Sequence, residues 1–233
     1  MSIFEQIEQY GVVPVIAIDA AADAVPLADA LLEGGLPVAE ITFRTDAALD
    51  SISAISSQRP ELLVGAGTVL TEGQVDNAKA AGAKFALSPG LDLDVLVRAE
   101  EADLPFAPGI MTPTDLQAAL NAGCKMVKFF PAMAAGGPNM LRNIAAPYAH
   151  TGIGFNPTGG VTTEDDLRDI ADLVRGKDVA IFIDEPYGHM GWNGQHHSPL
   201  AQPGMMDQCV AAYTFSKSYS MSGWRLGFSV SSV

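Results

Sequence analysis

The chain has little of several features that would define its class. Only two of its 233 residues are cysteines, Cys124 and Cys209, and neither has metal-ligand spacing around it. A disulfide framework is therefore not expected, and Cys124 is predicted to be a small core residue. No apolar run is long enough to cross a bilayer, and residues 1–10 lack the basic-then-apolar pattern of a signal peptide. These absences predict a cytoplasmic globular protein that binds no membrane.

Positive charge is also scarce. The chain carries 13 Lys and Arg against 27 Asp and Glu, which gives a formal net charge of -14. Binding to nucleic acid or to an anionic membrane needs a basic face that neutralises phosphate, so both partners are excluded. A small anionic substrate is compatible with this charge, because a few local cations can hold it.

Short apolar runs alternate with alanine-rich helical stretches. Strands are predicted at 12–18, 38–43, 62–69, 85–88, 106–108, 126–130 and 153–157, and helices at 2–10, 20–33, 45–57, 72–81, 93–102 and 114–121. Repeats of roughly 20 residues predict parallel strands with right-handed crossovers. Strands that are apolar nearly throughout fit a sheet buried on both faces. The fold class is therefore α/β, and seven strands favour a (β/α)8 TIM barrel over an open sheet.

In such a barrel the active site lies at the carboxyl ends of the strands. Polar residues collect at these ends: Glu40, Thr42, Arg44, Thr68, Ser88 with Pro89 and Gly90, Lys128, and Thr158 with Gly159 and Gly160. Lys128 has apolar neighbours on either side, and burial disfavours the charged form of an amine. A neutral amine is what Schiff-base chemistry requires. The alternative is a lysine at a strand end whose head reaches water.

Glu40, Thr42 and Arg44 share one face of their strand. A buried Glu40 needs a partner, and Lys128 is the natural one. A carboxylate beside a Schiff-base lysine can move protons for dehydration and for removing a proton from a substrate methyl group. Arg44 can clamp a substrate carboxylate through two parallel hydrogen bonds. The alternative is a structural pair of Glu40 with Arg44.

Two glycine-containing loops add further candidates. Thr68 follows Gly-Ala-Gly at 65–67, and these glycines let the backbone approach a ligand closely. The alternative is that Thr68 is only a helix cap. Gly159 and Gly160 follow a strand and could hold phosphate through their backbone amides.

With these motifs, residues 1 to about 163 resemble the 2-keto-3-deoxy-6-phosphogluconate (KDPG) and 4-hydroxy-2-oxoglutarate (KHG) aldolases. The matching stretches are Val-Pro-Val-Ile at 13–16, Glu-Ile-Thr-Phe-Arg-Thr at 40–45, Gly-Ala-Gly-Thr-Val at 65–69, Ser-Pro-Gly at 88–90, Pro-Gly at 108–109, Lys-Phe-Phe-Pro-Ala at 128–132 and Pro-Thr-Gly-Gly at 157–160. The resemblance implies a class I aldolase that cleaves KDPG to pyruvate and glyceraldehyde 3-phosphate. It also implies a small anionic 2-keto acid substrate, a homotrimer, no cofactor and no metal.

The resemblance assigns a role to each matching residue. Lys128 would form the Schiff base with pyruvate, and Glu40 would be the general acid and base. The substrate-binding residues would be Arg44, Thr68, Pro89, Phe130, Thr158, Gly159 and Gly160. Among them, the arginine and Thr68 would hold the pyruvate carboxylate, and the glycines would contribute to a phosphate site.

After Thr162 the sequence departs from this family and resembles a class I/II aminotransferase of the pyridoxal-phosphate fold. Asn-Pro-Thr-Gly at 156–159 fits both families, so the chain resembles a chimera joined near 156–163. The aminotransferase-like residues are Asn156, Asp184, Tyr187, Lys217 and Arg225, with the lysine in the internal-aldimine position. About 70 residues cannot supply a complete cofactor site, so no functional site is expected there. A pyridoxal-phosphate aminotransferase and a non-catalytic barrel are the alternative functions.

The two resemblances divide the chain into an aldolase-type barrel, residues 1–163, and an aminotransferase-like fragment, residues 164–233. Residues 164–187 have the length of one helix–strand unit, and Val179–Ile183 is apolar and rich in β-formers. The barrel is therefore either incomplete or closed by this run as a borrowed eighth strand. Residues 188–233 are expected to be an irregular tail, and its histidines show no metal spacing.

Overall fold

The computed structural model describes residues 1–159, 181–184, 209–214 and 227–230, and the chain divides into two compact units, 1–160 and 161–233. In the first unit the elements are α1 (Ile3–Glu8), β1 (Val15–Ile16), the 3₁₀ helix η1 (Ala21–Asp23), α2 (Ala24–Glu33), β2 (Val38–Thr42), α3 (Ala48–Gln58), β3 (Leu63–Gly67), α4 (Glu72–Ala80), β4 (Ala86–Leu87), α5 (Leu93–Glu101), β5 (Phe106–Ala107), β6 (Gly109–Ile110), α6 (Pro113–Asn121), β7 (Met126–Phe129), α7 (Gly137–Ala145), the 3₁₀ helix η2 (Ala146–Thr151) and β8 (Gly154–Pro157). None of the described helices is long and apolar enough to span a membrane.

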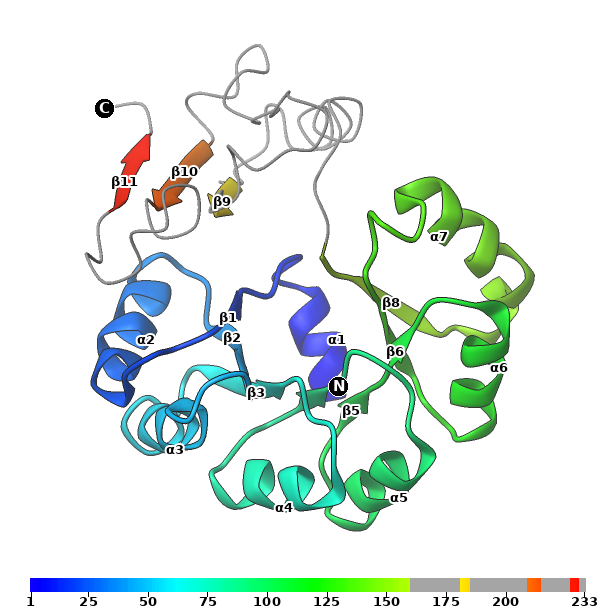
Figure 1. Cartoon of the computed structure of the whole chain (residues 1–233), viewed down its shortest axis with the longest axis horizontal. Coiled ribbons are helices and arrows are strands. Elements are labelled where there is room, and N and C mark those ends of the chain that lie inside the picture. The colour runs from blue at the N-terminus through cyan, green and yellow to red at the C-terminus, as the bar shows by residue number, and fades with distance from the viewer. Residues whose placement is uncertain (160–180, 185–208, 215–226, 231–233) are drawn as a thin grey trace. The chain divides into compact units, whose positions relative to one another are not determined.

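The strands of the first unit follow one another in chain order. One sheet runs β1-β2-β3-β4-β5 and the other β6-β7-β8, and all described pairings in them are parallel. Only Pro108 separates β5 from β6, so these two form one interrupted strand position and the unit has seven positions. The strands lie inside and the helices α2–α7 outside (Figure 1). The α/β class of the TIM-barrel type, with parallel strands, is confirmed.

The helices begin and end where the sequence supplies capping groups. Thr71 accepts a hydrogen bond from the amide of the third residue of α4, and Asp92 does the same for α5. Thr112 and Asp115 form a reciprocal capping box on α6. Gly82 and Gly123 follow α4 and α6 with φ of +92° and +83°, which is the left-handed stop expected of glycine there.

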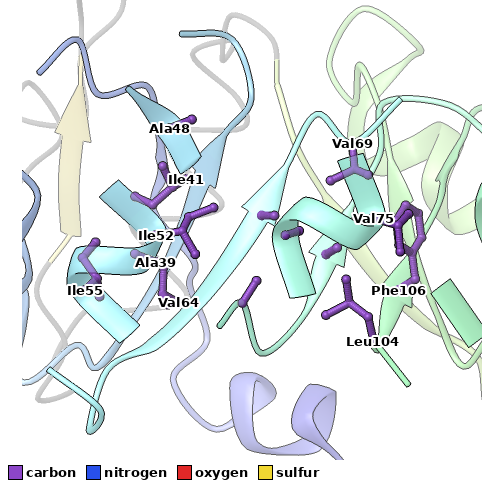
Figure 2. Packing of buried hydrophobic residues seen from close by; sticks show 14 of the residues in the cluster. Ala39, Ile41, Ala48, Ile52, Ile55, Val64, Val69, Val75, Leu104 and Phe106 are labelled. Carbon is purple, nitrogen blue, oxygen red and sulfur yellow. The ribbon is translucent and has the colours of Figure 1, made fainter. Parts of the chain in front are cut away.

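Apolar side chains between the strands and the outer helices form the largest core cluster. Ile52 and Ile55 of α3 pack toward Ile41 of β2 and Val64 of β3, and all four are at most 1% exposed (Figure 2). Burying a side chain of this size stabilises the fold by about 1.5–3 kcal/mol. The periodic apolar face of α3 is thus what attaches it to the strands.

The amino-terminal helix α1 closes one end of the strand ring. Its Phe4 and Ile7 pack against a cluster that contains Val38 at the start of β2 and Phe85 just before β4. The rings of Phe4 and Phe85 meet edge to face with centroids 6.4 Å apart. Figure 1 shows α1 within the ring of strands. Because it covers the amino-terminal strand ends, the carboxyl ends remain for the site.

The helix α7 was not predicted. Its N-cap is Gly136 and its first residue is Gly137, whose φ values of +107° and +62° are typical of a loop, and a proline comes next. Proline is nevertheless well suited to the first turn of a helix, where its missing N–H is not needed. The helix then buries Ile144 in the core cluster of β7.

Among the described strands, no pairing joins the first member of the ring, β1, to the last, β8. A cavity of about 420 Å³ has residues of both edges in its lining, Val12, Val13 and Val15 on the β1 side and Phe155, Pro157 and Gly159 on the β8 side. On the β1 side Val12 and Val15 are 57% and 38% exposed. An eighth strand that closed the barrel would have to join these two edges, and the described strands fill seven positions.

The second unit contains three described strands, β9 (Ile181–Asp184), β10 (Cys209–Thr214) and β11 (Gly227–Val230). β9 pairs in parallel with β10, which pairs antiparallel with β11. The run expected as an eighth barrel strand, 179–183, overlaps β9, and β10 is the partner of β9 among the described strands. The tail is not wholly irregular, because it contains β10 and β11.

Gly65 on β3 provides a test of this packing. A Cβ at Gly65 would lie 2.3 Å from the ring of Phe85, which is 1% exposed and cannot move without opening the core. We expect Gly65→Ala to lower the free energy of unfolding by about 1–3 kcal/mol in urea titrations. Gly73→Ala is the control, because nothing lies within 4 Å of its added Cβ in α4. That change should stabilise by about 0.5–1 kcal/mol, and similar losses in both variants would contradict the packing described.

Candidate active site

A buried ion pair occupies the centre of the site. Nζ of Lys128 on β7 donates to Oε1 of Glu40 on β2 at 3.0 Å. The two residues are 88 positions apart in the chain, and they are 5% and 0% exposed. The predicted pairing of Lys128 with Glu40 is therefore found, whereas a lysine that reaches water and a structural pair of Glu40 with Arg44 are not.

The missing side chain of Gly67 makes room for the carboxylate. A Cβ at Gly67 would lie 2.1 Å from Oε1 of Glu40 and 2.7 Å from its Cδ. The second oxygen, Oε2, is buried and has no hydrogen-bond partner among the described residues. A buried acceptor is costly to leave unpaired, so this oxygen is available to a proton or a hydroxyl of a bound ligand.

Phe130 lies on the same side of β7 as Lys128. Nζ of Lys128 is 5.7 Å from the centroid of the half-buried Phe130 ring. A Cβ at Gly159, whose φ is +84°, would lie 3.0 Å from that ring. The half-buried Thr158 is fixed to β7 because its amide donates to the carbonyl oxygen of Phe129 at 2.9 Å. Phe130 and the 158–159 turn thus form one side of the site, and Gly160 lies outside the described residues.

Arg44 is an exposed residue held at the carboxyl end of β2. Its Nε donates to Oγ1 of Thr42 at 3.1 Å, and that hydroxyl donates to the carbonyl oxygen of Ile16 at 3.0 Å. The sequence predicts Thr42 at the carboxyl end of its strand but indicates no specific function for its side chain. Only the folded backbone shows that Arg44 turns back toward Thr42, so spacing alone could not reveal this bond.

Thr68 is half-buried and has a φ of +58°, which is unusual for a residue other than glycine. The helix that follows is capped by Thr71, so Thr68 is not its cap. Residues held in this region of φ and ψ cost about 1–3 kcal/mol and cluster at ligand sites. The backbone of Thr68 therefore favours the interpretation as a ligand-binding residue.

The loop after β4 carries Pro89. It is pinned by the hydroxyl of Ser88, which donates to the carbonyl oxygen of Gly90 at 2.6 Å. Gly109 lets the loop approach, since a Cβ there would lie 2.1 Å from the carbonyl oxygen of Pro89. Gly109 is also the strand neighbour of Lys128 in the parallel register, so Pro89 lies one strand away from the ion pair.

Of the aminotransferase-like residues, Asn156 and Asp184 are among the described residues, and they belong to different units. Asn156 is opposite Lys128 in the register of β8 with β7, and its Oδ1 accepts from the hydroxyl of Thr158 at 3.3 Å. Asp184 ends β9 in the second unit, and the predicted positions Tyr187, Lys217 and Arg225 lie outside the described residues.

No metal cluster is found in the described part of the chain, and the thiol of Cys124 is shielded. It holds no group of three or more His, Cys, Asp and Glu side chains that could bind a metal ion. Cys124 is free and half-buried, and this burial raises the pKa of its thiol, which lowers its reactivity. The predicted interpretation of Cys124 as a packing residue agrees with these surroundings.

Comparison with known families gives two matches that overlap in the middle of the chain. The family described as KDPG and KHG aldolase matches residues 3–181, and the family described as aminotransferase class I and II matches residues 150–233. Residues 150–181 lie in both matches. The predicted change of resemblance near 156–163 falls inside this overlap.

Curated relatives and solved structures match the first part. The chain is 45% identical over 159 residues to the 2-dehydro-3-deoxy-phosphogluconate aldolase of Haemophilus influenzae, covering 68% of this chain and 74% of that protein. It is 46% identical over 151 residues to the KHG/KDPG aldolase of Escherichia coli, covering 65% and 70%. A KDPG aldolase structure from Legionella pneumophila, with pyruvate captured as a covalent carbinolamine, has 39% identity and a TM-score of 0.63 over 68% of this chain and 76% of that one. A Zymomonas mobilis KDPG aldolase has 38% identity and a TM-score of 0.66 over 72% and 80%.

The buried pair makes a prediction about stability. Removing one partner leaves a buried charge unpaired, so Lys128→Met should lower the free energy of unfolding by about 3–5 kcal/mol. The double variant Lys128→Met/Glu40→Gln should be less destabilised than Lys128→Met alone, since it buries no charge. Urea titrations of the four proteins in this cycle measure the coupling.

A surface ion pair serves as the control for that cycle. Arg98 bonds Asp76 at 2.6 Å, with side chains 35% and 49% exposed, so Arg98→Met should cost no more than about 1 kcal/mol. Additive losses from the Lys128 and Glu40 substitutions would contradict the coupling of the two side chains.

Proposed function

The chain belongs to the KDPG and KHG aldolase family, and we propose that it cleaves KDPG into pyruvate and glyceraldehyde 3-phosphate as a class I aldolase. The observation that carries the proposal is the buried Lys128–Glu40 pair with one free carboxylate oxygen. An amine in contact with a proton acceptor, away from bulk water, is the requirement for Schiff-base formation.

The first half of the proposed reaction forms the Schiff base. Glu40 takes a proton from Nζ of Lys128 across their 3.0 Å hydrogen bond, which leaves a neutral amine. The amine adds to the C2 carbonyl of the keto acid to give a carbinolamine. Glu40 then returns its proton to the C2 hydroxyl, water leaves, and an iminium remains.

The second half breaks the carbon–carbon bond. Glu40 accepts the proton of the C4 hydroxyl, the C3–C4 bond breaks, and its electron pair moves into the iminium to give an enamine and the free aldehyde. Protonation of the enamine at C3 produces the methyl group, and water releases pyruvate and the free lysine. The buried Oε2 of Glu40 is the acceptor that these transfers need.

The remaining predicted residues would orient the substrate. Arg44 and Thr68 would hold the carboxylate next to C2, and Pro89 and Phe130 would pack against the carbon chain. The support is their position around the pair, with Phe130 5.7 Å from Nζ and Pro89 one strand away. Thr158, Gly159 and Gly160 would face the phosphate. The ligand class is thus a small anionic 2-keto acid.

KHG is a second candidate substrate because a relative at 46% identity carries both names. The catalysis proposed needs no resident cofactor, and pyridoxal phosphate remains only the alternative suggested by the partial aminotransferase match. We further propose a homotrimer, which size-exclusion chromatography with light scattering would test.

Borohydride trapping tests the lysine. Pyruvate with borohydride should add a stable three-carbon label, and peptide mass mapping should place it on Lys128, because this amine is buried beside Glu40. Lys128→Met should abolish the label. Lys128→Arg is the matched control, since it keeps a cation opposite Glu40 but cannot form the imine. A label that persists in both variants and maps to Lys217 would overturn the assignment and favour the aminotransferase-like site.

Proton exchange tests the carboxylate. Glu40→Gln should still bind pyruvate but should lose exchange of its methyl protons with solvent by about 10²–10⁴-fold, the usual contribution of a positioned acid–base group. NMR in deuterated buffer measures this rate. Gly67→Ala should also slow exchange, because its Cβ would displace the carboxylate. An unchanged rate in Glu40→Gln would remove Glu40 from the mechanism.

A further inference from the structure

Thr42 ends β2 on the same face as Glu40, and its hydroxyl makes two bonds of fixed direction. It donates to the carbonyl oxygen of Ile16 at 3.0 Å and accepts from Nε of Arg44 at 3.1 Å. A carbonyl can only accept and a guanidinium can only donate, so the hydroxyl cannot reverse these roles. Thr42 is 1% exposed, which shields both bonds from competing water.

The bond to Nε folds Arg44 back along its own strand. Arg44 lies two residues beyond Thr42, yet its Nε returns to the level of the Thr42 hydroxyl. That level is two residues, or about 6.6 Å, above Glu40, given a rise of about 3.3 Å per residue. Since the bond uses Nε, it leaves the two terminal nitrogens at the open end of the guanidinium for a carboxylate.

The nature of the partner matters for charge. A carboxylate bonded to Nε would neutralise the guanidinium before any substrate arrived, whereas a hydroxyl orients it and leaves its charge uncompensated. Orientation counts because Arg44 is an exposed residue, and a free arginine side chain would lose rotamer freedom on binding a ligand.

Thr45 gives an internal comparison. Its hydroxyl donates to the carbonyl oxygen of Ile18 at 2.5 Å, so it joins the segment after β2 to the segment after β1, whereas Thr42 joins the ends of the two strands themselves. Among the described hydrogen bonds, only that of Thr42 also reaches an arginine. Comparing variants of the two threonines therefore distinguishes the effect of losing a bond between neighbouring segments from the effect of losing the bond to Arg44.

We propose that Thr42 is a positioning residue for substrate specificity: its hydroxyl presents the guanidinium of Arg44 to the carboxylate of the 2-keto acid. The inference rests on the proposed function, because that function defines the ligand. Thr42 itself touches no reacting atom and acts through Arg44.

The test compares trapping of pyruvate and of methyl pyruvate, which has the same ketone without the negative charge. In the parent chain, Thr42→Val, Thr42→Ser and Thr45→Val, the ligand concentration that gives half-maximal borohydride trapping is measured for both ligands. Thr42→Val should raise this concentration about tenfold for pyruvate, the effect of losing one hydrogen bond to a charged group, and leave it unchanged for methyl pyruvate. Thr42→Ser and Thr45→Val should behave like the parent.

A second arm uses Arg44→Met. If Thr42 acts through the arginine, Thr42→Val should add no further change in the Arg44→Met background. For each variant, the half-maximal concentrations for pyruvate and methyl pyruvate are measured on the same protein preparation and compared as a ratio. Partial unfolding lowers the amount of label for both ligands and does not change this ratio. Equal effects of Thr42→Val and Thr45→Val, or an undiminished effect in the Arg44→Met background, would show that Thr42 only joins strands.

The experiment also distinguishes failure of the proposed aldolase function from failure of the inference about Thr42. If pyruvate traps nothing in the parent chain, the proposed aldolase function is overturned and this inference with it. Trapping on Lys128 with the same pyruvate dependence in the parent and Thr42→Val overturns the inference alone.

Discussion

The buried ion pair between Lys128 and Glu40 is the constraint around which the first unit is built. Two charges with 5% and 0% exposure are tolerated only if each is the other's partner. That condition requires β2 and β7, 88 residues apart, to face each other across the strand ring. It also requires a glycine at position 67, because a Cβ there would take the place of Oε1. Backbone, packing and chemistry are thus tied to one contact.

The same pair leaves one hydrogen-bond acceptor without a partner, and the proposed proton transfers can use this acceptor. One carboxylate oxygen accepts from the lysine, and the other has no partner in the described part of the chain. A fully paired carboxylate would be more stable and less able to accept a substrate proton. Arg44 is also only partly bonded, since the hydroxyl of Thr42 fixes its orientation without neutralising its charge. In both cases a charged group is held in position by a bond that leaves part of it available to the proposed substrate.

Much of this was predictable from local patterns. Apolar runs, alanine-rich stretches and glycine stops predict the strands and most helices, and strand parity brings Glu40 toward Lys128. The patterns fail where structure depends on contacts distant in sequence or on atypical backbone. The helix α7 begins at residues typical of a loop. Thr68 was compatible with a helix cap until the fold showed Thr71 in that position. The bond from Arg44 to Thr42 requires the arginine side chain to fold back by two residues, which the pattern of apolar residues does not predict.

The place where the two family resemblances meet separates the residues proposed for keto-acid chemistry from those proposed to face the phosphate. The ion pair and Arg44, Thr68, Pro89 and Phe130 all precede the turn at 158–159. The residues proposed to face phosphate straddle that turn, where the two family matches overlap. The sequence Pro-Thr-Gly at 157–159 resembles both families there. Beyond it, β9 has its partner in β10. The residues proposed to recognise the keto acid therefore all lie in the first unit.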